Sequence, residues 1–94
     1  MDTNNPQQSV PNKDEQKLVE PKSIKRYPCR SSSLAQIGYD KDSRILEVVF
    51  TTGGTFRYYG VSATLWENLI HASSMGGYFS RAIRKGGFRY RRVR

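Results

Sequence analysis

Aromatic and basic side chains are interleaved in two stretches of this chain, and together these residue types can hold a single-stranded nucleic acid. In the first stretch Phe56 and Tyr58 alternate with Arg57 and Tyr59, and the second is the C-terminal run RAIRKGGFRYRRVR. Aromatic faces stack bases for about 1–3 kcal/mol per base, and arginine makes paired hydrogen bonds to phosphate. The candidate nucleic-acid-binding residues are therefore Arg57, Tyr58, Tyr59, Arg81, Arg84, Lys85, Arg89, Tyr90, Arg91 and Arg92.

The positive charge is concentrated at one end of the chain. The net charge is +8, but residues 31–80 carry three basic and four acidic groups, whereas residues 81–94 carry seven basic groups and no acidic one. A partner that is attracted by charge should therefore meet the C-terminus. RNA or single-stranded DNA has the complementary charge, and so does an acidic protein surface.

Few residues could support catalysis or hold a metal ion. His71 is the single histidine, and the acidic residues show no recognisable spacing. Arg26 and Arg30 could lower the pKa of Cys29, but a nucleophilic thiol also needs a base and an orienting group, so we interpret this cysteine as structural or incidental. We expect no enzyme activity, no metal site and no cofactor.

The candidate residues must be positioned by the elements around them, and residues 31–61 predict a β-meander. Three apolar-rich runs are separated by turn signals at 40–43 and 51–54, with no room for a helix between them. In the first run Ala35, Ile37 and Tyr39 alternate with Leu34, Gln36 and Gly38; in the second, Leu46, Val48 and Phe50 share one side. Adjacent strands should be antiparallel.

The third run decides which candidate residues face a partner. On a strand, Phe56 and Tyr58 share one face, and Arg57 and Tyr59 share the other. The aromatic pair is more often buried under helices than used as a stacking platform, because such rings are readily buried. In that case Arg57 and Tyr59 are the exposed candidates.

Two short helices should cover one face of the sheet. Residues 62–72 carry an apolar stripe behind a plausible N-cap at Ser62, and residues 74–85 repeat that spacing behind Ser74. Gly76 and Gly77 either permit close packing or delay the start of the second helix, and Gly86 can take the left-handed position at its end. The predicted fold class is α+β: a three-stranded antiparallel β-meander followed by two short helices packed on one face, in the order β-β-β-α-α.

Composition divides the chain into three parts. Residues 1–28 are polar and contain four prolines, so we expect a disordered N-terminal arm; docking of its apolar residues on a partner or on the domain is the alternative. Residues 29–87 form the domain, and residues 88–94 a basic C-terminal tail. No apolar run approaches a membrane span of about 20 residues, and the N-terminus lacks a signal-peptide core, so we expect a cytoplasmic protein.

Residues 31–90 resemble the KTSC domain, a short module named for its occurrence at the C-terminus of some lysyl-tRNA synthetases and also found as small stand-alone proteins. The resemblance rests on SSSLAQIGYDKDSRILEVVF, GGTFRYYGV and LWENLIHASSMGGYFSRAIR taken in order. The Y-x-Y of the family falls on Phe56-Arg57-Tyr58, so the first ring is kept and its hydroxyl is lost. The resemblance implies the fold, suggests RNA binding and brings no catalytic residues.

These observations favour a small non-enzymatic module that binds RNA or single-stranded nucleic acid. The basic C-terminus would supply affinity, and Arg and aromatic residues of the third strand would contact bases. The alternative is a protein–protein adaptor or a homodimerising module that uses the sheet edge or the N-terminal arm. The sequence leaves the oligomeric state open.

Overall fold

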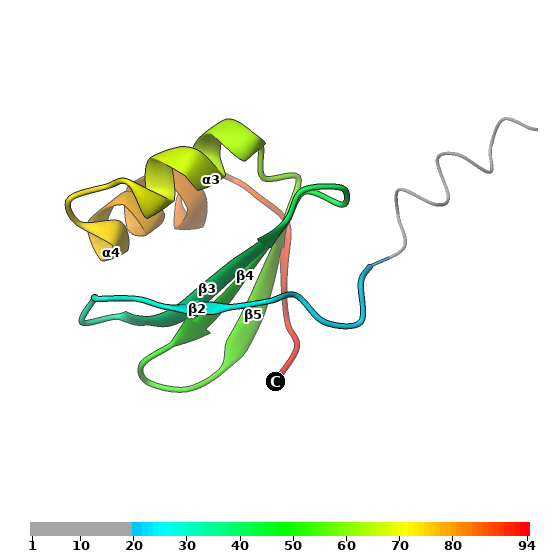
Figure 1. The fold of residues 1–94 in the computed structure, drawn as a ribbon, viewed down its shortest axis with the longest axis horizontal. Coiled ribbons are helices and arrows are strands. Elements are labelled where there is room, and N and C mark those ends of the chain that lie inside the picture. Colours follow the sequence, from blue (N-terminus) through cyan, green and yellow to red (C-terminus); the bar gives the residue numbers. More distant parts are fainter. Residues whose placement is uncertain (1–19) are drawn as a thin grey trace, which may run out of the picture.

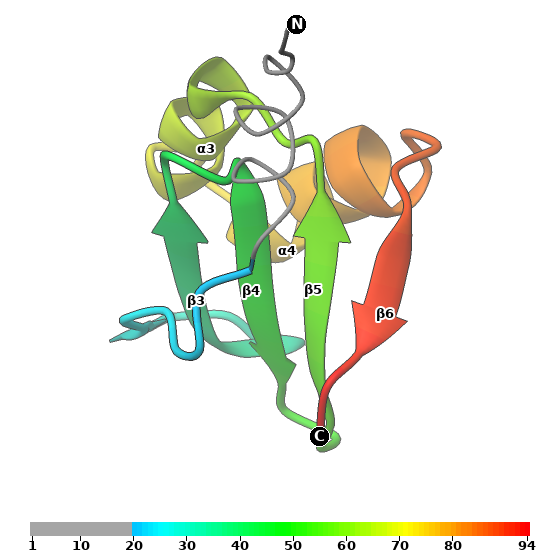
Figure 2. The same ribbon diagram turned by 90° about the vertical axis from the view of Figure 1, so that its right-hand side faces the viewer.

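The structure, a computed structural model, describes residues 20–94, and these form a five-stranded antiparallel sheet with two helices on one face (Figures 1 and 2). Each strand pairs with the next one along the chain. The strands are β2 (Tyr27–Pro28), β3 (Leu34–Asp40), β4 (Ile45–Phe50), β5 (Thr55–Tyr59) and β6 (Tyr90–Arg92). The helical segments are α3 (Ala63–Ile70), α4 (Met75–Tyr78) and the π-helical η1 (Phe79–Arg84).

The predicted meander corresponds to β3, β4 and β5, and its turns form as their residue types indicate. The Asp40 carboxylate accepts a hydrogen bond from the backbone N–H of Ser43 at 3.0 Å in the first turn. In the second, Gly53 and Gly54 have φ angles of 102° and 90°, which side chains with a Cβ rarely adopt. The α+β class and the antiparallel meander are confirmed, but the sheet has two more strands than the sequence predicted.

A β-bulge changes the predicted alternation in β3. The register with β4 shifts between Leu34 and Gln36, which places an extra residue in β3. Leu34 and Ile37 therefore both belong to the buried core, although strict alternation predicted opposite faces for them.

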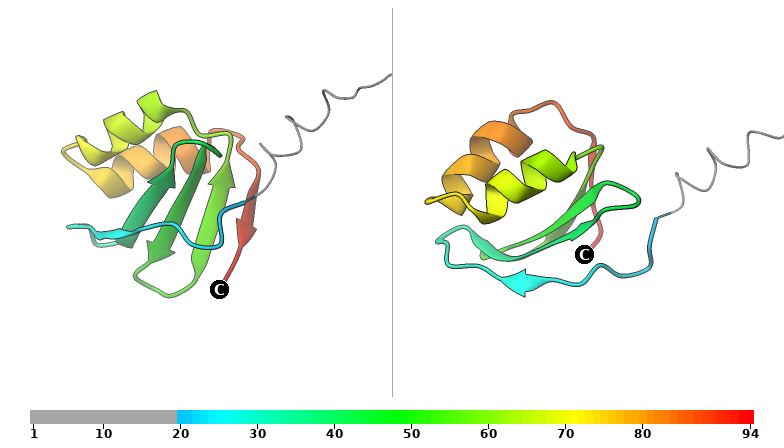
Figure 3. Two further views of the ribbon diagram at one scale, coloured as in Figure 1. Left: turned by 45° about the vertical axis from the view of Figure 1, so that its right-hand side comes forward. Right: turned by 45° about the horizontal axis from the view of Figure 1, so that its top comes forward.

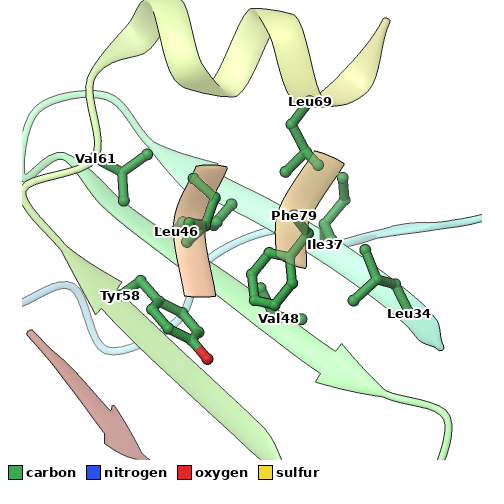
Figure 4. Packing of buried hydrophobic residues seen from close by; sticks show 9 residues of the cluster. Leu34, Ile37, Leu46, Val48, Tyr58, Val61, Leu69 and Phe79 are labelled. Carbon is green, nitrogen blue, oxygen red and sulfur yellow. The ribbon is translucent and has the colours of Figure 1, made fainter. Parts of the chain in front are cut away.

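The hydrophobic core lies between the helices and the sheet (Figure 4). Leu46 and Val48 of β4 share one side of the strand, as predicted, and that side faces the helices together with Tyr58 of β5. Phe79 of η1 stands edge-on to Tyr58, with ring centroids 5.3 Å apart. The interpretation of Tyr58 as a core residue beneath the helices is therefore correct.

The helices begin where the serines indicate. The Ser62 hydroxyl accepts from the N–H of Leu65 at α3, and the Ser74 hydroxyl accepts from the N–H of Gly77 at α4, both at 3.2 Å. A Cβ on Gly76 would lie 2.7 Å from the Ser33 hydroxyl, so this glycine permits close packing and does not delay the helix. The single predicted helix over 74–85 is an α-helical turn followed by a π-helix, and Gly87, not Gly86, takes the positive φ after it.

The face of the sheet opposite the helices is covered by residues 20–28, which we call the N-terminal strap (Figure 3, right). Ile24 is buried, and Tyr27–Pro28 pairs with β3 as strand β2. The strap passes over Gly38, where an added Cβ would lie 2.1 Å from the Lys25 carbonyl oxygen. Residues 20–28, predicted as part of a disordered arm, instead lie on the sheet, which agrees with the alternative of docking on the domain. Residues 1–19 lie outside the described part of the chain.

The predicted basic tail is largely the edge strand β6. Phe56 pairs with Arg92, Arg57 with Arg91 and Tyr58 with Tyr90. Beyond the strand, the Val93 N–H donates to the Thr55 carbonyl at 2.7 Å. Arginine is tolerated on a short edge strand because its charge remains in water, so composition alone did not distinguish this strand from a solvated tail.

Candidate functional site

A groove on the helix side of the sheet gathers aromatic and basic residues between η1 and strands β4, β5 and β6. Two adjoining cavities of about 660 Å³ and 290 Å³ share Phe50, Phe56 and Arg84 in their walls. Tyr58 and Tyr90 line the smaller cavity, and Arg92 lines the larger one. We call this surface the helix-side groove; its hydroxyl-bearing wall contains Ser32, Ser33, Thr51, Thr52 and Ser80.

The aromatic wall is built by strand register. Tyr58 and Tyr90 are cross-strand neighbours, and their rings stack with centroids 5.4 Å apart and planes 27° apart. Phe56 lies 6.3 Å from Tyr90 and packs edge-on against Phe50 at 5.5 Å. Tyr90 is 62% exposed, so its ring offers the face turned away from Tyr58 to a ligand.

Two guanidinium groups stand over these rings. The Arg84 guanidinium carbon lies 5.2 Å from the centroid of Phe50, and that of Arg92 lies 5.9 Å from the centroid of Phe56. Arg92 also donates from Nε to the Arg94 carbonyl at 2.8 Å. Within residues 20–94 no aspartate or glutamate side chain lies in ion-pair range of Arg84 or Arg92. The Arg84 guanidinium and the terminal nitrogens of Arg92 can therefore still bind an anion.

The Tyr58 hydroxyl is held in its neutral form. Burial raises the pKa of Tyr58, and although the nearby Arg84 charge and hydrogen bond act in the opposite direction, burial outweighs them. Because the ring is only 4% exposed, Tyr58 supports Tyr90 from below and presents little surface of its own. Tyr58 was predicted to bind nucleic acid, and the structure places it at the floor of the smaller cavity.

With this geometry in view, comparison with known proteins assigns the family. The family model of the KTSC domain matches residues 30–90. The chain belongs to the KTSC domain family. A crystal structure of a KTSC domain protein from Yersinia pestis is similar to the whole domain, with a TM-score of 0.72 and 39% sequence identity over 77% of this chain and 100% of that one.

Two further proteins are similar to this chain. An uncharacterized protein of Stutzerimonas stutzeri is 37% identical over 70 residues, which cover 74% of this chain and 99% of the relative. A protein of Tsukamurella paurometabola is 33% identical over 57 residues, which cover 61% of this chain and 85% of the relative. The family assignment made from sequence motifs is thus confirmed.

Arg57 does not occupy the exposed position that strand alternation predicted for it. It lies on the strap side of this KTSC domain and is 6% exposed, and its Nε donates to Glu47 at 2.7 Å. Its Nη1 donates both to the Glu20 carboxylate at 2.9 Å and to the Pro21 carbonyl at 2.8 Å. Arg57 is a buried structural cation, because the strap covers the face that would otherwise be open.

The remaining predicted residues line neither cavity of the groove. Arg81 and Lys85 are exposed on or just beyond η1. Arg89 stacks over the ring of Tyr59 with its guanidinium carbon 5.2 Å from the ring centroid, and Arg91 donates to the Tyr59 hydroxyl at 3.1 Å. The sequence therefore identified Arg84, Tyr90 and Arg92 of the groove, but grouped with them residues that the sheet separates.

Phe50 and the hydroxyl-bearing wall were not predicted as site residues. The available signal for Phe50 was its shared side with Leu46 and Val48, but that pattern predicts a core residue equally well. Ser32 and Ser33 reach the groove because the chain turns ahead of β3, where the Ser31 hydroxyl accepts from the N–H of Leu34 at 3.2 Å.

Residues 20–94 contain no cluster of three or more side chains suited to hold a metal ion. The same part of the chain has no helix of the length and apolarity needed to cross a membrane.

Cys29 is predicted to react slowly with alkylating reagents. Burial raises the pKa of its thiol above the ordinary value of 9.0, contrary to the effect expected from neighbouring arginines. The thiolate is the reactive species, so the midpoint of the alkylation rate against pH should lie at a higher pH in the native domain than in the denatured chain. Iodoacetamide labelling followed by mass spectrometry checks this, with the denatured chain as control; a native midpoint below that of the denatured chain would contradict it.

Proposed function

We propose that this KTSC domain is a non-enzymatic module that binds single-stranded nucleic acid, RNA or DNA, in the helix-side groove. The observation that supports the proposal is the placement of Arg84 and Arg92 over a wall of four aromatic rings, with no aspartate or glutamate side chain in ion-pair range within residues 20–94. Guanidinium groups bind phosphates and open aromatic faces stack bases. The groove therefore presents phosphate-binding and base-stacking groups on one surface.

In this proposal the groove residues contact different parts of the nucleic acid. Arg84 and Arg92 contact two phosphates of an extended strand, and the free face of Tyr90 stacks a base between them. Serine and threonine hydroxyls along the larger cavity can bond sugar or phosphate oxygens. A single strand is favoured over a duplex, because stacking on a side chain requires an unstacked base.

The edge of β6 favours a second candidate function. In the described residues β6 pairs only with β5, so its outer backbone groups can accept another strand. The arginines of β6 would repel a second copy of the same strand and attract an acidic extended peptide. This adaptor function, unlike the first, needs the backbone edge and not the Tyr90 ring.

Removing the two groove arginines is predicted to weaken binding of labelled 12-nucleotide RNA and DNA and to reduce the salt dependence. Each phosphate contact to a single strand contributes a slope of about 0.7 in log K against log salt, so Arg84→Gln with Arg92→Gln should lower the slope by about 1.4. Fluorescence anisotropy at several salt concentrations measures both quantities.

The matched control removes equal charge elsewhere. Lys25 and Lys41 are exposed on the strap and on the β3–β4 turn, so Lys25→Gln with Lys41→Gln should leave the slope nearly unchanged. Equal losses in the two double variants would show that only net charge matters. Binding that is absent in the parent protein would overturn the proposal and direct attention to the β6 edge.

Tyr90→Leu is predicted to weaken binding about 5- to 150-fold, which corresponds to the loss of one stacked base at about 1–3 kcal/mol. Leucine keeps apolar bulk next to Tyr58 but removes the aromatic face. Tyr27→Leu is the control, because Tyr27 is 50% exposed on β2, the edge strand at the opposite end of the strand order from β6. The same titrations at fixed salt compare the two variants, and an unchanged affinity in Tyr90→Leu would exclude stacking at this position.

A further inference from the structure

The strap side of the sheet contains a carboxylate held by three donors from two strands. Arg57 Nη1 and Arg91 Nη2 lie 2.9 Å and 3.0 Å from one oxygen of Glu20, and the Tyr59 hydroxyl donates to the other at 2.9 Å. We call Arg57, Tyr59 and Arg91 the cradle. Its donors belong to β5 and β6, whereas Glu20 belongs to the strap.

The cradle is more rigid than its occupant. Arg57 is buried and fixed by Glu47, and Arg91 is its cross-strand neighbour in the β5–β6 register. Glu20 lies at the beginning of the strap, and its side chain is 30% exposed. Small movements of the strap can therefore release the carboxylate while β5 and β6 retain the geometry of the cradle.

More positive charge surrounds the cradle than Glu20 balances. A cavity of about 270 Å³ next to it is lined by Lys22, Arg26, Arg57, Arg91 and Arg94, with Glu47 as the acidic residue in its wall. Glu47 is already shared by Arg26 at 2.8 Å and Arg57 at 2.7 Å. An occupant with two negative charges would suit this field better than a carboxylate with one.

The pKa of Glu20 is lowered, as expected in the positive field of the surrounding basic residues. Partial burial acts to raise the pKa of Glu20, but the hydrogen bonds from Tyr59 and Arg57 and the charge of Arg91 outweigh it and lower the pKa. The cradle thus favours the ionised form of the group inside it, even where water is partly excluded.

We propose that the cradle and the adjacent cavity form a binding site for a phosphate monoester dianion, and that Glu20 occupies this site in cis as a competing carboxylate. Two guanidinium groups and a phenol hydroxyl match the several acceptor oxygens of phosphate. The site lies on the opposite face from the helix-side groove, and its existence does not depend on nucleic-acid binding there.

Competition by Glu20 sets the expected size of the effect. A tethered group competes at a high effective concentration, and a site that is free for about a tenth of the time binds its ligand about tenfold more weakly. Glu20→Gln keeps the size and a hydrogen-bond acceptor but removes the charge. Its affinity for phosphate should exceed that of the parent protein by about tenfold.

The test titrates full-length parent and Glu20→Gln protein with inorganic phosphate, with a nucleoside 5′-monophosphate and with the corresponding nucleoside, and follows the NMR signals of Tyr59 and Arg91. We expect saturable shifts at both residues with the two phosphates, tighter in the variant, and none with the nucleoside. If the monophosphate binds more tightly than inorganic phosphate, the ligand of the site is a phosphorylated molecule. If the two bind equally, the ligand is free phosphate.

Two further variants keep the result specific. Tyr59→Phe and Arg91→Gln, each combined with Glu20→Gln, should weaken phosphate binding at least several-fold, whereas Glu67→Gln removes an exposed carboxylate and should behave as the parent. The proposal is overturned if Glu20→Gln binds phosphate no more tightly than Glu67→Gln, or if the shifted signals lie outside the cradle. Retained β2 and Ile24 signals establish that the strap is still folded.

Discussion

Glu47→Ala is expected to lower the free energy of unfolding by about 3 kcal/mol, a large part of the 5–15 kcal/mol that stabilises a small domain. Glu47 is 4% exposed and bonds both Arg57 and Arg26. Removing one member of a buried ion pair leaves a desolvated charge and costs about 3–5 kcal/mol. The lower end applies here because Glu20 still contacts Arg57.

Urea denaturation followed by tryptophan fluorescence measures this loss, since Trp66 stacks on Tyr39 in the folded domain. Glu67→Ala is the matched control: its carboxylate is 61% exposed on α3, so the change should stay within about 0.5 kcal/mol. Glu47→Leu combined with Arg57→Met removes both charges at similar volume and should recover much of the stability. If Glu47→Ala costs no more than Glu67→Ala, the pair is not desolvated in solution.

The parts of the fold that were predicted from sequence are those specified by local chemistry. The turn residues Asp40 and Gly53 indicated where strands end, and Ser62 and Ser74 indicated where the helices begin. Each of these signals acts over a few residues, so a single sequence is enough to interpret them.

The missed strands depend on contacts that their own residue types do not specify. β2 contains only Tyr27–Pro28, and its position follows from Ile24 and Lys25 passing over Gly38. β6 pairs with β5 across the thirty residues 60–89 that separate the two strands. Proline and arginine at these positions resemble the composition of disordered segments, so the local pattern favoured an arm and a tail.

The candidate site was predicted in part for the same reason. Alternation along β5 correctly separated Phe56 and Tyr58 from Arg57 and Tyr59. It did not reveal that the strap covers the Arg57 side, because that cover is formed by residues far away in sequence. The groove instead forms where η1 ends and β6 begins, which brings Arg84, Tyr90 and Arg92 together.

Strand β6 contributes side chains to both faces of the sheet. β6 presents Tyr90 and Arg92 to the helix-side groove and Arg91 to Glu20, since neighbouring residues of a strand face opposite ways. Residues that were grouped by sequence as one basic tail therefore serve two surfaces. The surface that contains Arg91 and Glu20 depends on how closely the strap packs on the sheet.

Gly38→Ala is expected to detach residues 20–26 of the strap and to lower the free energy of unfolding by about 2 kcal/mol. An added Cβ would lie 2.1 Å from the Lys25 carbonyl oxygen, so the backbone of the strap must move. Exposing Ile24 costs about 1.5–3 kcal/mol, and alanine in an unobstructed strand position would return about 0.4–1 kcal/mol. Limited trypsin digestion with mass spectrometry should show faster cleavage at Lys22 and Lys25, while the helix-side core stays folded.

A double-mutant cycle with Ile24→Ala separates strap detachment from a general effect on β3. Ile24→Ala alone removes the buried contact of the strap and should destabilise the domain by a similar amount. If Gly38→Ala has already displaced the strap, adding Ile24→Ala should cost less than about 0.5 kcal/mol more, because that side chain is then already in water. Additive costs in the double variant, or unchanged trypsin cleavage in Gly38→Ala, would show that the strap tolerates the methyl group and that Gly38 acts through β3 itself.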